Sequence, residues 1–116
     1  MNGNLNSSNS ANSPLGEGGI LELATIDIKQ GTNTDFENNL EKAQHVISQS
    51  KGYISHQFQK CIEQENRYIL LIKWETLEAH TKGFRESELF KEWRALIGPF
   101  FESAPQVQHY ELKFEM

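Results

Sequence analysis

The chain has few of the residues that support disulfide or metal chemistry. Only one of its 116 residues is a cysteine, Cys61, so no disulfide can form within the chain. Its four histidines lie at positions 45, 56, 80 and 109, without the close spacing of zinc-binding motifs and without a cluster of carboxylates. We therefore expect neither a metal site nor a cysteine-based site.

Positive charge and long apolar runs are also scarce. Sixteen acidic residues against eleven basic ones give a net charge of -5, which argues against nucleic acid or an anionic membrane as a partner. No apolar segment is long enough to span a bilayer, and the N-terminus lacks the blocks of a signal peptide. No glycine-rich loop joins an expected strand to a helix, as dinucleotide binding would require. These absences predict a cytoplasmic protein without a bound cofactor.

The first nineteen residues differ in composition from the remainder. Residues 1–19 are mostly Asn, Ser and Gly, with one charged residue, Glu17. Such a segment cannot bury enough apolar area to offset the entropy of ordering it. We predict a disordered tail at 1–19 and one domain at 20–116.

Alternating strand-like and helix-like patterns run through residues 20–116. We expect strands at 20–28, 53–61, 67–75 and 107–114. Helices are expected from Thr34, from Ser87 and, over a shorter stretch, from Thr76 to about Gly83. Thr34 and Glu37 have the spacing of a capping box. The order β-α-β-β-α-β predicts a ferredoxin-like α+β fold, with a four-stranded antiparallel sheet and both helices on one face.

The strand at 67–75 is apolar on both sides. One side carries Tyr68, Leu70, Ile72 and Trp74. The opposite side carries Ile69 and Leu71, and the first strand is also apolar on both sides. Two helices can cover only one face, which would leave a large apolar patch exposed. We therefore predict a homodimer in which two sheets meet face to face.

The stretch from Asn66 to His80 reads Asn-Arg-Tyr-Ile-Leu-Leu-Ile-Lys-Trp-Glu-Thr-Leu-Glu-Ala-His, and Ser87-Glu-Leu-Phe follows it. This succession resembles the antibiotic biosynthesis monooxygenase family, and the length and element order from Ile20 to Phe114 agree with it. The resemblance implies a dimeric α/β barrel. The family includes cofactor-free oxygenases of aromatic quinols, haem-degrading enzymes and signal-processing proteins, so the resemblance defines the fold better than the chemistry.

The resemblance also implies a site at the corner between the third strand and the following helix. Its expected catalytic residues are Trp74, His80 and Arg94. Trp74 would stack on an aromatic ring, His80 would accept or orient a phenolic proton, and Arg94 would stabilise the resulting anion. This reading predicts a cofactor-independent monooxygenase that acts on a small aromatic or quinol substrate.

The expected substrate-binding residues are Phe84, Trp93, Leu70 and Tyr68. Aromatic-substrate oxygenases of the family carry an Asn at the position of Leu70, so one hydrogen-bonding group of that site is absent here. The histidines at 56 and 109 fall on expected edge strands and are interpreted as surface or interface residues. Tyr110 is expected to be buried.

Two alternatives remain open, and a third is disfavoured. A non-catalytic binding module would be favoured by a cavity too small for a ring, and an acid–base enzyme (isomerase) on a small polar metabolite by a compact polar pocket. Haem degradation is disfavoured. Family members with that activity use an Asn, a Trp and a haem-ligating His where this chain has Ala24, Phe84 and Arg94, so the axial ligand is absent.

Overall fold

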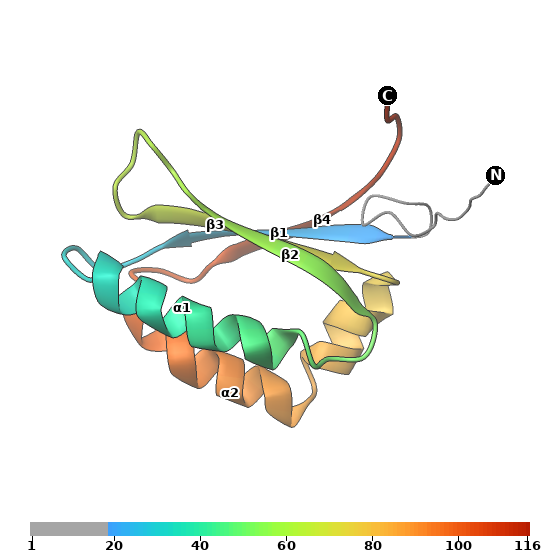
Figure 1. Cartoon of the computed structure of the whole chain (residues 1–116), viewed down its shortest axis with the longest axis horizontal. Helices are drawn as coiled ribbons and strands as arrows, with labels where there is room; N and C mark the ends of the chain where they lie inside the picture. Colours follow the sequence, from blue (N-terminus) through green and yellow to red (C-terminus); the bar gives the residue numbers. More distant parts are fainter. Residues whose placement is uncertain (1–18) are drawn as a thin grey trace.

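The computed structural model of the chain describes residues 19–116, so the predicted tail falls almost wholly outside the described residues. The elements are β1 (Ile20–Asp27), α1 (Asn33–Ile47), β2 (Tyr53–Lys60), β3 (Arg67–Trp74), η1 (Ala79–Phe84), α2 (Glu88–Ile97), η2 (Gly98–Phe100) and β4 (Gln106–Glu111). The strands pair antiparallel in the order β2-β3-β1-β4. Both α-helices lie on one side of this sheet (Figure 1), which confirms the predicted ferredoxin-like arrangement.

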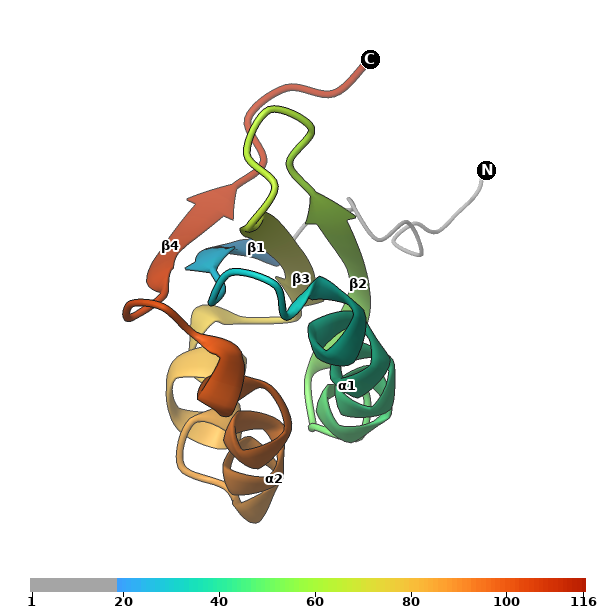
Figure 2. The ribbon, with the colours of Figure 1, turned by 90° about the vertical axis from the view of Figure 1, so that its left-hand side faces the viewer.

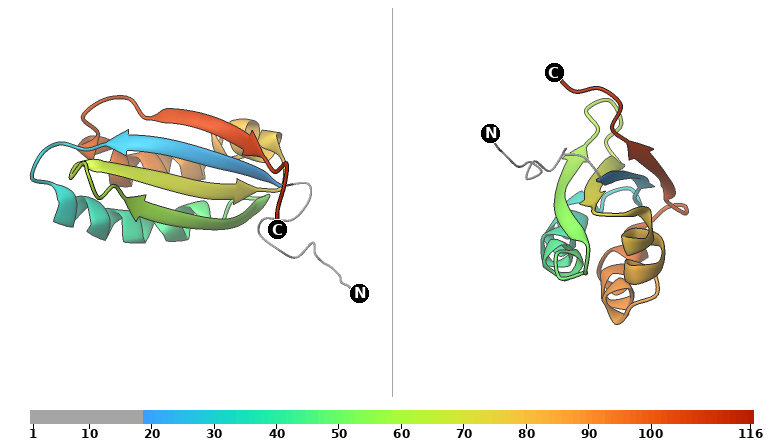
Figure 3. Two further views of the ribbon diagram at one scale, coloured as in Figure 1. Left: turned by 90° about the horizontal axis from the view of Figure 1, so that it is seen from above. Right: turned by 90° about the vertical axis from the view of Figure 1, so that its right-hand side faces the viewer.

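The two faces of the sheet have different surroundings. On the helix side, Ala24 pairs with Leu70 and Ile26 with Tyr68, and all four side chains are buried. Leu21 and Leu23 point to the other side and are only half-buried. Seen from above, that side carries no helix among the described residues (Figure 3). The strand alternation predicted from the sequence is confirmed.

Helix α1 forms a close-packed layer with β2 and β3. Its buried residues are Phe36, Leu40, Ala43, Val46 and Ile47. The Phe36 ring lies 4.8 Å from the Tyr68 ring and 5.9 Å from the Phe100 ring, measured between centroids. The chain then turns into β2 through Gly52, which has a φ of +87°. A Cβ at Gly52 would lie 2.6 Å from the Cβ of Ala79, so both backbone and space require glycine.

The predicted capping box at the start of α1 is wrong. The helix begins one residue before Thr34, with Thr32 as its N-cap. The Glu37 carboxylate does not return to the helix start; it accepts a hydrogen bond of 2.6 Å from the Tyr68 hydroxyl. Asn33 also binds that hydroxyl, at 2.9 Å. The Glu37 carboxylate therefore binds Tyr68 in the tertiary structure and does not form the N-terminal cap that the local sequence pattern predicted.

The last strand is shorter than predicted, because β4 pairs only with β1. Ile20, the first residue of β1, lies opposite Glu111, so later residues have no partner strand in the part of the chain that the structure describes. Tyr110 is 46% exposed and Phe114 is 94% exposed, which corrects the expectation that Tyr110 is buried.

The two helices cover different halves of the sheet. Figure 2 shows α1 beneath β2 and β3, and α2 beneath the side formed by β1 and β4. A hydrogen bond of 2.9 Å from the Asn39 amide to the Leu96 carbonyl joins the two helices. The hydroxyl of Ser87 accepts the Phe90 N–H at 3.3 Å and caps the start of α2, the helix that was predicted to begin near this residue.

Among residues 19–116, no helix has both the length and the apolar character that crossing a bilayer requires.

Candidate functional site

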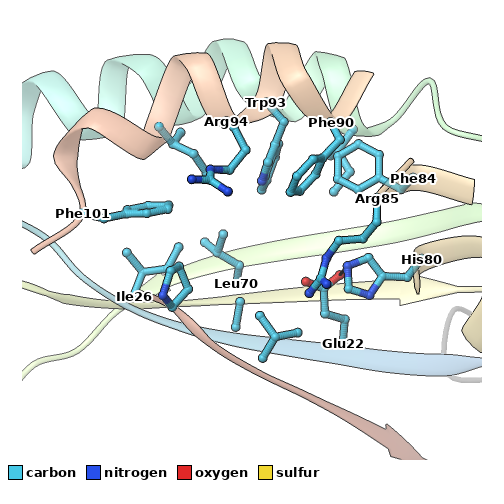
Figure 4. Close-up of a pocket in the computed structure, with 15 residues that line it drawn as sticks. Glu22, Ile26, Leu70, His80, Phe84, Arg85, Phe90, Trp93, Arg94 and Phe101 are labelled. Atoms are coloured by element: carbon cyan, nitrogen blue, oxygen red, sulfur yellow. Dashed lines mark ion pairs between the residues drawn. The ribbon is translucent and has the colours of Figure 1, made fainter. Parts of the chain in front are cut away.

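A cavity of about 380 Å³ lies between α2 and the sheet. Aromatic and aliphatic side chains form most of its wall, among them Leu70, Phe84, Phe90, Trp93 and Phe101. Its polar lining residues are Glu22, His80, Arg85 and Arg94. The close-up shows Glu22, His80 and Arg85 gathered at one end, and Arg94 reaching in from α2 (Figure 4). An apolar wall with a few converging polar groups is typical of a small-molecule site.

The short helix η1 brings the polar end together. The Thr76 hydroxyl accepts the Ala79 N–H at 3.1 Å, and the Arg85 N–H donates to the His80 carbonyl at 3.0 Å. This last bond spans five residues, so the turn is wider than an α-turn. His80 and Phe84 are 3% and 2% exposed, and both line the cavity together with Arg85.

Glu22 is a buried carboxylate on the helix side of β1, with only 6% of its surface exposed. Its Oε1 accepts a hydrogen bond of 2.9 Å from Trp74 Nε1 and lies 3.4 Å from His80 Nε2. Burial raises the pKa of Glu22 from its ordinary 4.5 to about 7, although the Trp74 hydrogen bond and the Arg85 charge both lower it. Glu22 therefore changes charge in the neutral pH range.

His80 lies between Glu22 and a second histidine. Its ring stacks on Trp74, with 5.4 Å between centroids and 18° between planes. His80 Nδ1 lies 2.8 Å from His109 Nε2, and His109 sits directly opposite Glu22 in the β1–β4 register. Burial lowers the pKa of His80 to about 4, and burial also lowers the pKa of His109. His80 is therefore neutral at neutral pH, with a single N–H on its ring.

The structure places five of the seven predicted site residues on the cavity wall. These are His80, Arg94, Phe84, Trp93 and Leu70. The Arg94 guanidinium carbon also lies 5.9 Å from the centre of the Phe90 ring. The cavity answers the question of size that the sequence left open, because a volume above 300 Å³ lies in the range of small-molecule pockets.

Trp74 and Tyr68 do not line the cavity. Trp74 is fully buried behind it, where it binds Glu22 and stacks on His80. Tyr68 lies beside α1, and its hydroxyl contacts Glu37 and Asn33. The expected contacts of these two aromatic residues with a ligand are replaced by contacts within the protein.

Sequence reasoning missed three polar groups of the site: Glu22, Arg85 and His109. Glu22 left a signal, because a lone carboxylate falls among the apolar residues of the first strand. His109 left none, since only the pairing of β4 with β1 brings it to Glu22. His109 is half-buried on the edge strand β4, and its Nε2 lies against His80, a contact that its interpretation as a surface or interface residue did not include.

A resident metal ion finds no ready ligand set here. Within residues 19–116, no three His, Cys, Asp or Glu residues are arranged to hold one. His80 and His109 direct ring nitrogens at each other rather than at a shared point, so a proton and not a cation fits between them.

Comparison with known proteins gives one family model, one relative by sequence and two similar solved structures. A family model described as antibiotic biosynthesis monooxygenase matches residues 19–96. The uncharacterized protein YczJ of Bacillus subtilis is 44% identical over 92 residues, which cover 79% of this chain and 97% of YczJ. A candidate antibiotic biosynthesis monooxygenase from Bordetella bronchiseptica has a similar crystal structure, with a TM-score of 0.82, 35% identity, and coverage of 84% of this chain and 100% of that one. SnoaB, a cofactor-independent oxygenase from Streptomyces nogalater, shares the fold with a TM-score of 0.71, 10% identity, and coverage of 84% and 96%.

Proposed function

Because this chain belongs to the antibiotic biosynthesis monooxygenase family, we propose that it is a cofactor-independent monooxygenase that oxidises a small planar aromatic or quinol with molecular oxygen. The observation that carries this proposal is the placement of one buried carboxylate, Glu22, at the end of an aromatic-lined cavity. With a pKa of about 7, that carboxylate can accept a phenolic proton at neutral pH.

In such a reaction the substrate itself supplies the electrons. Loss of a proton from its hydroxyl gives a phenolate, which passes one electron to O₂, and the two resulting radicals combine into a carbon-bound peroxide. The O–O bond then breaks. One oxygen atom stays on the carbon as a carbonyl, and the other leaves as water with the two hydrogens that the substrate has lost. No further reductant is needed for this balance.

We assign the proton-accepting role to Glu22 and a supporting role to His80. A base works best when its pKa lies near the operating pH, and the pKa of about 4 for His80 lies well below it. Trp74 acts as a positioning residue, because it fixes both the Glu22 carboxylate and the plane of the His80 ring.

The remaining cavity residues divide into ring-binding and charge-stabilising groups. Phe84, Phe90 and Trp93 present aromatic faces and edges to a planar ligand. Arg85 and Arg94 supply fixed positive charge, which favours a phenolate or a peroxide over the neutral substrate. Leu70 contributes an apolar wall where a polar group would bind a hydroxyl, so we expect ligand orientation to depend on Glu22 and the arginines.

We further propose that two copies of the chain assemble through the open face of the sheet. That face carries half-buried Leu21, Leu23, Ile69 and Leu71 and no helix among the described residues. A second copy packed sheet to sheet would remove this apolar surface from water. Analytical ultracentrifugation at micromolar concentration tests this, and a single species with the mass of one chain would contradict it.

Oxygen consumption tests the proposed reaction directly. The wild-type chain, Glu22→Gln and Glu41→Gln are supplied with a panel of anthrones, anthrols and hydroquinones in chelator-treated buffer. Glu41 is exposed on α1 and serves as the matched control. We expect oxygen uptake with the wild type and with Glu41→Gln, and a fall of roughly 100-fold or more with Glu22→Gln.

Binding is measured in parallel, so that loss of chemistry can be separated from loss of the site. Trp93 lines the cavity, so an aromatic ligand should quench tryptophan fluorescence. Quenching without oxygen uptake by any compound would reject the monooxygenase in favour of a binding module. Uptake that Glu22→Gln leaves unchanged would reject Glu22 as the base.

An acid–base enzyme is the second candidate, and the Glu22–His80 pair favours it. A carboxylate that titrates near neutral pH can move a proton on a substrate without any oxygen. Exchange of substrate hydrogen with D₂O under anaerobic conditions, with no oxygen uptake in air, would support this candidate over the oxygenase.

A further inference from the structure

Glu22, His80 and His109 form a row that leads from the cavity to the edge of the sheet. Glu22 Oε1 lies 3.4 Å from His80 Nε2, and His80 Nδ1 lies 2.8 Å from His109 Nε2. The first distance exceeds a usual hydrogen bond, as is common in active sites before a substrate binds. His109 belongs to the edge strand β4 and is half-buried, and its Nδ1 has no partner within residues 19–116. The inner end of the row is therefore enclosed, and its outer end lies near solvent.

The row has two self-consistent arrangements of protons. When Glu22 is protonated, it donates to His80 Nε2, His80 Nδ1–H donates to His109 Nε2, and the His109 proton sits on Nδ1. When Glu22 is ionised, His80 Nε2–H faces the carboxylate and His109 Nε2–H donates to His80 Nδ1. Both rings are neutral in both arrangements. In passing from the first arrangement to the second, the Glu22 proton moves to His80 and the His80 proton moves to His109. The proton on His109 Nδ1 is released to water.

Within residues 19–116, no other neighbour of Glu22 can take its proton. Trp74 only donates to it, and the guanidinium of Arg85 does not give up or accept a proton in this pH range. With a ligand in the cavity, water cannot reach the carboxylate from the front, because the residue is only 6% exposed even without one. The His80 ring is the remaining path.

We propose that His80 and His109 form a proton relay through which Glu22 exchanges its proton with solvent while the cavity is occupied. This inference rests on the proposed role of Glu22 as the base. The relay lets the carboxylate return to its ionised form after it has taken the substrate's proton, and it can deliver a proton back for the peroxide. Oxygen chemistry can then proceed without opening the cavity.

The charges around Glu22 come from three sides. His80 and Arg85 approach from η1 and the residue after it, His109 faces it from β4, and Arg94 lines the same cavity from α2. Next to Glu22, β3 offers the N–H of Trp74 but no charge. Among these groups only Glu22, His80 and His109 can exchange a proton near neutral pH, because a guanidinium stays protonated, so the relay can be followed without interference from the arginines.

The first test uses the resting protein without substrate. Nitrogen-15 NMR of the imidazole rings reports which nitrogen carries the proton, and carbon-13 labelling of the glutamate carboxyls reports the ionisation of Glu22. From pH 5.5 to 8.5 we expect His80 and His109 to change tautomer together, and the midpoint of this change should coincide with the midpoint of the Glu22 titration. In Glu22→Gln this change should vanish. A His80 ring that keeps one tautomer while Glu22 titrates would overturn the relay, whether or not any substrate is ever oxidised.

The second test uses turnover of whichever substrate supports oxygen uptake. His109→Ala removes the outer member of the row, and we expect turnover to fall roughly 10- to 100-fold. Added imidazole should restore it in proportion to imidazole concentration, because a small base can replace the missing ring at the sheet edge. His109→Gln keeps polar contact but cannot pass a proton on, so its turnover should also be low and should not respond to imidazole.

The two variants separate a relay from a merely structural role. Normal turnover of His109→Gln would mean that His109 only supports the position of His80, and would overturn the proposal. A loss in His109→Ala that imidazole does not reverse, with His80 tautomers unchanged from the wild type, would overturn it as well. If no compound is oxidised at all, the proposed function fails, and the NMR test still decides whether the relay exists.

Discussion

The two halves of the helix-covered sheet face are built from similar apolar strands and have different interiors. Under α1 the space is filled, since five residues of that helix are buried against the sheet. Under α2 only Trp93 and Ile97 are buried, and a cavity of about 380 Å³ remains. Because the strand residues on both sides are apolar, the difference between a packed core and a cavity comes from the side chains of the two helices. One half of the molecule can therefore supply stability while the other holds a ligand.

The buried polar groups of the two halves differ in the same way. Under α1, burial and the hydrogen bond to Glu37 raise the pKa of Tyr68 to about 12, so its hydroxyl stays protonated. Under α2, burial raises the pKa of Glu22 only to about 7, where its charge changes under ordinary conditions. A group that keeps one protonation state serves structure, and a group that switches near neutral pH can serve chemistry.

The largest effect should come from opening a hole in the filled half. Phe36 is fully buried against Tyr68 and Phe100. We expect Phe36→Ala to reduce the free energy of unfolding by about 3–5 kcal/mol, because a cavity is left in packed surroundings. Urea denaturation followed by circular dichroism measures the change. A loss below about 1 kcal/mol would show that this half is not close-packed.

A smaller effect of opposite sign is expected at the polar end of the cavity. The folded-state pKa of Glu22 lies above its ordinary 4.5, so its contribution to stability is full below about pH 4.5 and is lost as the pH rises through about 7. A rise of the pKa from 4.5 to about 7 corresponds to a change of roughly 3 kcal/mol in the free energy of unfolding, at about 1.4 kcal/mol per pKa unit. Gln at this position does not titrate, so Glu22→Gln should gain stability relative to the wild type by about 2–3 kcal/mol between pH 5 and pH 8.

Denaturation of both proteins at several pH values measures that difference. The lowered pKa of His80 acts in the other direction, since its contribution is present above about pH 6.5 and is lost as the pH falls toward 4. Comparing the two proteins at the same pH removes this contribution to first order. A stability difference that stays constant from pH 5 to pH 8 would mean that Glu22 is not buried as the structure has it.

The smallest effect on stability should come from the cavity wall. Phe90 is only half-buried and borders the cavity on one side. We expect Phe90→Ala to reduce the free energy of unfolding by about 1 kcal/mol, since little packing is lost, while the affinity for a planar aromatic ligand falls about 10-fold. Fluorescence titration and urea denaturation give the two numbers. Phe36→Ala, measured at a temperature where it stays folded, should show a large loss of stability and little change in the affinity for the ligand.

Strand alternation made most of this fold predictable. The two-sided apolar pattern of β3 identified the sheet centre, and Ser87 marked the start of α2. Local patterns failed where a distant residue competed, as at Glu37, whose carboxylate binds Tyr68 and not the helix start. Of the aromatic wall, Phe84 and Trp93 were predicted as substrate-binding residues, and Phe90 and Phe101 were not. The row of Glu22, His80 and His109 was not predicted, because these residues come from β1, η1 and β4 and only the folded register brings them together.

The wide turn of η1 has a consequence for how the polar end of the cavity can change over time. Its i to i+5 bond between His80 and Arg85 contains one residue more than an α-turn does. Deletion of a single codon between Thr81 and Gly83 would close an ordinary α-turn and carry Arg85 away from Glu22, while the sheet and both long helices stayed in place. A change of length in η1 would thus alter the surroundings of the proposed base Glu22 without any substitution at the carboxylate itself.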